Sequence, residues 1–303
     1  MWLESIAVEK YQISILVGVT IGFLARIYLL RVDYRQYPSY PHGYVTHISF
    51  GFIAAALGAV AIPAIMQPDF TAVTFLAVAA TQFREVRKLE RETLENLDAS
   101  ELIPRGKDYI EGIARVFEAR NYLVMAVALI SSGATFWGNW VYGVAGGGLA
   151  LLAAFRLMSG QVVGDISEVV PASLTFKESL LMVEGIFLMN VGLPAHREKI
   201  LKEGLAVLIK PRQDNARATL DNLGQRQAIL HVASALLGTK RESGELEFSP
   251  AVGKDIDTGK IAIFLLPMEP DMECLIEAIQ RVPILESSLR RPLATRAGRA
   301  AAD

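Results

Sequence analysis

An uncharged stretch of 35 residues, 121–155, constrains this chain more than any other feature of its sequence. It directly follows residues 108–120, in which charged side chains recur every three or four positions. Because one membrane-spanning helix needs about 20 mostly apolar residues, the stretch is long enough to enter a bilayer and turn back. The pairing predicts membrane helices with a polar segment at the edge of the bilayer.

The composition supports a membrane assignment and removes several classes of site. Of the 303 residues, 52% are hydrophobic and the mean hydropathy is +0.33, both above the usual values for soluble domains. The net charge of −2 implies no general attraction to nucleic acid or to anionic lipid. The single cysteine, Cys274, excludes a disulfide within the chain and a multi-cysteine zinc site. We expect a reduced thiol on the apolar side of a helix, and neither a metal nor a cofactor.

Five segments are apolar enough to be interpreted as membrane spans. The third is the shortest, and the last two form a hairpin that turns at Gly138-Asn139. Gly146, Gly147 and Gly148 in the last segment would let helices approach one another closely. The expected spans are residues 11–30, 43–66, 70–83, 122–137 and 141–158.

The basic residues predict the orientation of these spans. Residues 84–120 contain eight lysines and arginines, whereas the opposite loops, 67–69 and 138–140, contain none. Because loops rich in lysine and arginine stay in the cytoplasm, we expect a multi-pass protein of the cell membrane. Its N-terminus would lie outside and residues 159–303 in the cytoplasm.

Arg26, near the end of the first span, is a candidate site residue because an ionisable side chain within a span is a functional hypothesis by default. Two explanations remain open. The side chain could extend to the lipid headgroups, or it could pair with a carboxylate of residues 108–118. His47, inside the second span, is expected to hydrogen-bond a neighbouring helix. His42 and His47 do not align on one helix face, so no metal site is predicted.

The segment 84–120 is expected to be cytoplasmic. Residues 84–98 predict an exposed amphipathic helix with a thin apolar stripe, and residues 103–106 break it. The stripe consists of Val86, Leu89, Leu94 and Leu97.

A second helix, 108–120, gathers its charges on one side. At 100° per residue, its charged side chains fall within an arc of about 80°. Gly112 lies beside this arc and would allow something to approach closely. The charged residues are Asp108, Glu111, Arg115 and Glu118, and the opposite side carries Tyr109, Ile110, Ile113, Ala114, Val116 and Phe117. Two interpretations remain: a polar cavity at the cytoplasmic membrane face, or an interfacial helix with ordinary surface ion pairs.

Residues 165–288 predict a small cytoplasmic α+β domain. Apolar runs of strand length alternate with amphipathic helices, which suggests helices on one sheet, with a ferredoxin-like arrangement as the candidate. The expected strands are residues 180–190, 205–210, 260–266 and 284–287, and the expected helices are 215–237, ending at Gly238, and 270–282. Residues 289–303 are expected to be a disordered tail.

The hexapeptide Tyr109-Ile110-Glu111-Gly112-Ile113-Ala114 resembles the signature of the YIEGIA family, membrane proteins of endospore-forming Firmicutes. The length and the multi-span first half are similar as well. The resemblance implies a sporulation-associated setting, without a biochemical mechanism.

Asp108 and Asp165 offer a catalytic alternative. Both flank the predicted hairpin on its cytoplasmic side. Two close carboxylates share a proton and can activate water as acid and base. Membrane aspartyl proteases use such a dyad, although Gly164-Asp165 retains only part of their Gly-x-Gly-Asp motif.

The sequence therefore favours an integral membrane protein whose cytoplasmic domain binds or positions a partner protein. The alternative is a membrane-embedded aspartyl protease that acts on a protein substrate at the cytoplasmic face. In both cases the chain contacts the lipid bilayer, and nucleic acid is not an expected partner.

Overall fold

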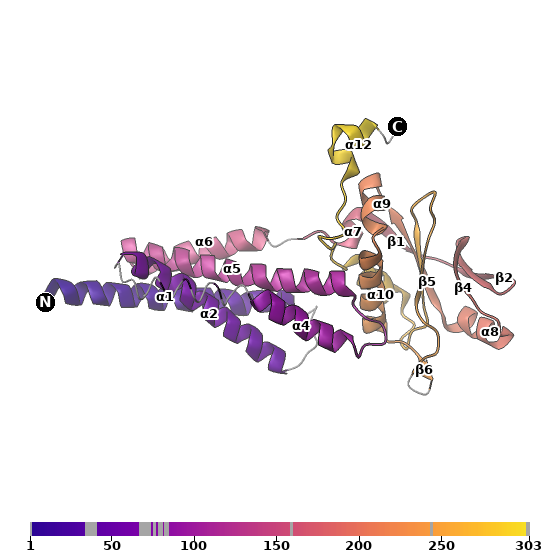
Figure 1. The fold of residues 1–303 in the computed structure, drawn as a ribbon, viewed down its shortest axis with the longest axis horizontal. Coiled ribbons are helices and arrows are strands. Elements are labelled where there is room, and N and C mark those ends of the chain that lie inside the picture. Colours follow the sequence, from indigo (N-terminus) through magenta and orange to yellow (C-terminus); the bar gives the residue numbers. More distant parts are fainter. Residues whose placement is uncertain are drawn as a thin grey trace. The chain divides into compact units, whose positions relative to one another are not determined.

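The computed structural model describes residues 2–33, 41–66, 74, 77, 81, 85–157, 160–242 and 245–300 (Figure 1). The chain divides into two compact units. The helical unit comprises Met1–Thr93 and Ile113–Ser159, and the α+β unit comprises Leu94–Gly112 and Gly160–Asp303. Residues 94–112 thus group with the second half of the chain, whereas the sequence predicted an α+β domain of residues 165–288 alone.

The helical unit contains α1 (Trp2–Asp33), α2 (Pro41–Met66), the start of α4 (Val86–Asp98), most of α5 (Lys107–Trp137) and α6 (Trp140–Leu157). Within the described residues, Glu9–Leu30 and Gly43–Met66 are long and apolar enough to cross a membrane. They coincide with the predicted spans 11–30 and 43–66.

The structure supports two candidate spans rather than five. The predicted spans 122–137 and 141–158 are helical in α5 and α6, and the apolar helix Trp140–Arg156 is shorter than a full span. The predicted span 70–83 lies outside the described residues except for 74, 77 and 81, which are helical.

Several polar side chains are buried inside this unit and several large apolar ones face outward, beside an apolar core that includes Leu29 and Phe117. Leu16, Ile65 and Leu149 are 68–69% exposed. In contrast, Ser131 and Ser132 are completely buried, and Ser132 Oγ donates a hydrogen bond to the Ala59 carbonyl at 2.8 Å. A water-soluble bundle would bury its large apolar side chains instead.

Small residues hold the helices together at short range. A Cβ at Gly58 of α2 would overlap the carbonyl oxygen of Met125 in α5. A Cβ at Gly147 of α6 would come within 2.6 Å of Ile21 in α1, which confirms the close approach expected there. Gly148 has no neighbour within 4 Å of such a Cβ.

The α+β unit is built, in the part the structure describes, on a four-stranded sheet of order β1-β5-β9-β8 with antiparallel pairing throughout. The strands are β1 (Ser167–Pro171), β5 (Leu205–Pro211), β8 (Ala251–Lys254) and β9 (Ile261–Leu265). All five residues of β9 are buried, so the core of the unit lies around this strand.

The topology contains a split β-α-β unit. Strands β5 and β8 both run antiparallel to β9, so they are parallel to each other with β9 between them. The connection passes through α9 (Asp214–Leu220) and α10 (Leu223–Leu237). In the β-α-β-β-α-β order a last strand follows the second helix, whereas here β1, from the start of the unit, occupies that edge.

A second sheet and several helices complete the unit. β2 (Leu174–Lys177), β3 (Leu180–Val183) and β4 (Ile186–Asn190) form an antiparallel meander, whose Leu181 packs with Phe264 of β9. The remaining elements are α7 (Val163–Ile166), α8 (Pro194–Glu203), β6 (Arg241–Glu242), β7 (Glu245–Leu246), α11 (Met272–Gln280), η1 (Pro292–Ala294) and α12 (Arg296–Ala300).

Several predicted boundaries were wrong for local reasons. The predicted strand 180–190 is a hairpin, because Glu184 and Gly185 take positive φ angles of 49° and 82° and turn the chain. The predicted helix 215–237 is two helices, since the Asn222 side chain accepts a hydrogen bond from Gln225 N and starts α10.

The end of the chain also differs from the prediction. Residues 284 and 285 are irregular and 286–288 form a turn, so there is no strand at 284–287, and 289–300 contain η1 and α12 rather than a disordered tail. Cys274 is exposed on α11 instead of lying on its apolar side.

Candidate functional site

Four helices of the helical unit bring ionisable side chains into its interior. Arg26 of α1 is completely buried, and His47 of α2, Glu90 of α4 and Arg120 of α5 are 5–8% exposed. Together with the Phe117 ring of α5, we call these residues the Arg26 cluster. Burying charge in an apolar environment is costly unless the groups satisfy one another, so their geometry matters.

Arg26 and His47 make the central contact. Arg26 Nη2 lies 3.1 Å from His47 Nδ1, and Arg26 Nε donates to the His47 carbonyl oxygen at 3.4 Å. Because a guanidinium can only donate, Nδ1 accepts and the proton of a neutral ring is assigned to Nε2. That nitrogen faces Glu90 Oε1 at 3.9 Å. The imidazole therefore links a cation to a carboxylate.

Phe117 covers the same contact. Its ring centroid lies 5.2 Å from the Arg26 guanidinium carbon and 4.4 Å from the imidazole centroid. The first distance is within the range of a cation–π interaction. Burial, together with the nearby charge of Arg26, lowers the pKa of Arg120 to about 10, which leaves it protonated at neutral pH.

The absence of a side chain at Gly51 makes room for Arg26. A Cβ at Gly51 would overlap Arg26 Cγ and lie 2.9 Å from both its Cβ and its Cδ. His47 and Gly51 are four residues apart in α2, so they face the same direction. One face of α2 therefore supplies both the partner of the arginine and the space that it occupies.

The structure excludes one of the two explanations for Arg26, and pairing with a carboxylate of residues 108–118 stays a prediction. The complete burial of its side chain contradicts extension into the headgroup region, and the hydrogen bond of His47 to a neighbouring helix is confirmed. Glu90 was missed, since its charge suggested an exposed position. The buried side of α4 is Val86, Glu90 and Leu94, spaced four residues apart, while Leu89 of the predicted stripe is 51% exposed.

The hexapeptide helix buries its apolar side as expected. Tyr109, Ile110, Ile113, Ala114 and Phe117 are at most 5% exposed, whereas Val116 is 39% exposed. On the charged side, Arg115 is exposed and the half-buried Glu118 forms an ion pair with Arg87 at 3.7 Å.

Gly112 does not provide the close approach predicted for it. An added Cβ would meet Leu285 Cδ2 at 3.5 Å, an ordinary van der Waals distance. The half-buried Glu111 lies one residue before it. The charged arc therefore does not need a glycine at this position on steric grounds.

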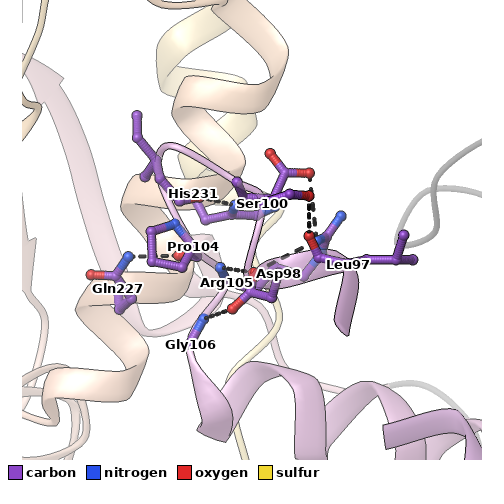
Figure 2. A network of polar contacts seen from close by, with 10 residues as sticks. Leu97, Asp98, Ser100, Pro104, Arg105, Gly106, Gln227 and His231 are labelled. Atoms are coloured by element: carbon purple, nitrogen blue, oxygen red, sulfur yellow. Dashed lines mark hydrogen bonds and ion pairs between the residues drawn. The ribbon is translucent and has the colours of Figure 1, made fainter. Parts of the chain in front are cut away.

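The connection between α4 and α5 is fixed to α10 inside the α+β unit (Figure 2). Asp98 carboxylate oxygens accept hydrogen bonds from Arg105 N at 2.6 Å and Gly106 N at 3.3 Å. Gln227 Nε2 donates to the Pro104 carbonyl at 2.6 Å. His231 Nδ1 lies 2.7 Å from the Ile103 carbonyl, and because a carbonyl only accepts, Nδ1 carries the proton. We call residues 98–106 the α4–α5 loop.

His231 therefore packs between this loop and the first residue of the hexapeptide. It is 8% exposed, and the Tyr109 ring lies edge-on to it at 6.4 Å. Burial lowers the pKa of His231, although its hydrogen bond to Ile103 opposes this effect. Burial raises the pKa of Tyr109 to about 12. The first hexapeptide residue thus belongs to a packed, uncharged contact.

Asp108 and Asp165 each contact a different helix start. A Cβ at Gly224, in the first turn of α10, would overlap Asp108 Oδ2 and come within 2.7 Å of its Cβ. A carboxylate at this end of a helix is stabilised by the helix dipole. Asp165 is exposed, and its Oδ2 accepts a hydrogen bond from Val162 N at 2.9 Å. Both carboxylates therefore support helix starts.

No group of three or more His, Cys, Asp or Glu residues in the described part of the chain could hold a metal ion.

Comparison with known proteins gives a family and one curated relative. A family model described as "YIEGIA protein" matches residues 14–295. The "Uncharacterized protein YphB" of Bacillus subtilis (strain 168) is 45% identical over 285 residues, which cover 94% of this chain and 96% of that protein. No solved structure matches the chain.

Proposed function

The chain belongs to the YIEGIA protein family, and we propose that it is a multi-pass membrane protein whose α+β unit binds or positions a partner protein. Sporulation is the setting that we propose for this activity. The single observation that carries the membrane proposal is the inside-out character of the helical unit.

The buried fractions of the two candidate spans measure this inside-out character. Only 33% of the apolar window of Glu9–Leu30 and 44% of that of Gly43–Met66 are buried. The core helix of a soluble protein would be mostly buried. Because exposed apolar surface of this extent is unfavourable in water and favourable in lipid, a bilayer is the environment that matches these helices.

Contacts with α1 and α2 support additional spans in α5 and α6. Ala128 of α5 would lie 2.7 Å from a Cβ at Gly22 of α1, and Gly147 of α6 contacts α1 in the same way. Helices packed this closely share one environment. We therefore propose five spans, including residues 70–83, with the N-terminus outside and the α+β unit in the cytoplasm.

Two experiments test insertion and orientation. An integral protein should stay with membranes after alkaline washing, and release into the aqueous fraction would end the proposal. The exposed Cys274 is an endogenous probe. A membrane-impermeant maleimide should label it only after permeabilisation, and should label Asn139→Cys in a Cys274→Ser background in intact cells. The reverse pattern would invert the topology.

The partner-binding role is supported by apolar side chains on a unit that has its own core. Phe187 of β4 is 52% exposed, and Leu193 and Leu201 at the two ends of α8 are 59% and 51% exposed. Phe187→Ser should leave membrane abundance unchanged and impair sporulation. A normal spore yield with this variant would argue against partner binding at β4.

A second candidate function is the aspartyl protease. The observation in its favour is that Asp108 and Asp165 belong to the same compact unit. Asp108→Asn and Asp165→Asn would each abolish processing of a protein substrate at normal protein abundance if the two carboxyls share a proton. Mild effects of both variants would leave only their helix-capping roles.

A further inference from the structure

The segment 289–300 concentrates positive charge at one end of an otherwise acidic unit. It contains four arginines, Arg290, Arg291, Arg296 and Arg299, and no acidic residue. Residues 160–288 contain 13 basic and 18 acidic residues. We call residues 289–300 the arginine arm. Such segregation of charge marks a surface for a partner of opposite sign.

The backbone of the arm is fixed on α9. Arg290 N donates to Thr219 Oγ1 at 3.1 Å, and Leu293 N donates to Asn215 Oδ1 at 3.0 Å. Thr219 is only 2% exposed, so this attachment lies at the edge of the core. The arm therefore presents its side chains from a defined position, which lowers the ordering cost of binding.

The guanidinium groups of the arm are available to a partner. Arg291, Arg296 and Arg299 are exposed, and among the described residues none of them forms an ion pair with a carboxylate. In the same unit, Arg281 pairs with Glu277 and Lys240 pairs with Glu203. The acidic residues of the unit thus leave the arm unneutralised.

We propose that the arginine arm binds the anionic headgroups of the bilayer in which the helical unit is embedded, an inference that rests on the proposed membrane location. Only residues 158–160 separate α6 from Gln161, whose carbonyl oxygen accepts a hydrogen bond from Ile284 N at 2.9 Å, five residues before the arm. Arginine clusters close to a membrane helix bind anionic lipid. Residues 289–303 contain no aromatic side chain on which bases could stack, so single-stranded RNA is a poorer match.

The test uses the full chain reconstituted into vesicles. A fluorophore on Ala297→Cys, in a Cys274→Ser background, reports contact with a headgroup-attached spin-label quencher. We expect quenching in vesicles of phosphatidylcholine with phosphatidylglycerol and none in phosphatidylcholine alone. Salt at about 1 M should abolish it, since the screening length falls to about 3 Å.

Charge removal supplies the matched comparison. Each arginine near an anionic surface changes affinity roughly fivefold, so Arg296→Gln combined with Arg299→Gln should weaken docking roughly 25-fold. Arg281→Gln removes one exposed positive charge outside the arm and should have no effect.

Equal quenching in both lipids, or insensitivity to the double variant, would overturn the proposal. So would an arm that responds only to added oligoribonucleotide in phosphatidylcholine vesicles. Flotation with those vesicles after alkaline washing separates the two proposals. A chain that floats with an unquenched arm refutes only the lipid contact, whereas a chain that washes off refutes both.

Discussion

Replacing Gly51 by alanine tests whether Arg26 is held as the structure shows. The added Cβ would overlap Arg26 Cγ, and the arginine is completely buried with its guanidinium against His47. The side chain cannot yield without leaving that partner or separating α1 from α2. The position of this buried arginine can therefore be tested by the loss of stability that the substitution causes.

The expected size of the effect follows from three contributions. Overpacking costs about 1–3 kcal/mol, and breaking the contact with His47 costs about 1–3 kcal/mol more. Replacing glycine by alanine within a helix returns about 1 kcal/mol. We expect Gly51→Ala to lower the free energy of unfolding by about 1–5 kcal/mol.

The assay is unfolding of the purified protein in mixed micelles, with Gly148→Ala as the matched control. Gly148 lies in an apolar helix with nothing within 4 Å of an added Cβ, so its replacement should be neutral or stabilising by up to about 1 kcal/mol. In an Arg26→Ala background, the cost of Gly51→Ala should shrink by more than about 1 kcal/mol.

Two results would refute the reasoning. Equal stabilities of the Gly51→Ala and Gly148→Ala variants would show that Arg26 does not occupy the space beside Gly51. An unchanged cost in the Arg26→Ala background would place the strain elsewhere on α2.

Three further predictions concern the α+β unit. Gly112→Ala should raise its stability by up to about 1 kcal/mol, because the new Cβ meets only ordinary contacts; a loss in thermal melts would reveal a missed clash. The lowered pKa of His231 means that the unfolded chain binds the extra proton first, so the protection factors of the α10 amides against hydrogen exchange should fall as the pH drops below 6.5; His231→Gln should flatten this dependence, and an unaltered slope would assign it to another group. Gln227→Ala leaves the exposed Pro104 carbonyl without its donor, at a cost of about 0.5–1.5 kcal/mol, and should speed trypsin cleavage after Arg105; wild-type cleavage rates would count against a tightly held α4–α5 loop.

The sequence predicted the helices and strands that depend on local runs of apolar residues. The spans 11–30 and 43–66 follow from apolar length alone, and they lie within α1 and α2. Strands β5 and β9 were found because buried strands are continuous apolar runs. The hairpin at Glu184 was missed because a glutamate with positive φ has no reliable sequence signal.

The contacts that define the candidate site lie beyond local pattern. His231 meets a carbonyl 128 residues away, and Arg26 meets His47 across two helices. Glu90 occupies an otherwise apolar face of α4 and faces an imidazole of α2 there. Such pairings depend on tertiary packing, which overrides the preference of a charged residue for solvent.

The membership of residues 94–112 in the α+β unit has a practical consequence for anyone who wishes to study that half in isolation. A fragment that begins at residue 160 would lack the carbonyl partners of Gln227 and His231. It would also expose the side of His231 that packs against Tyr109. Expression of the domain calls for two discontinuous pieces of polypeptide, 94–112 and 160–300, supplied together by fusion or co-expression.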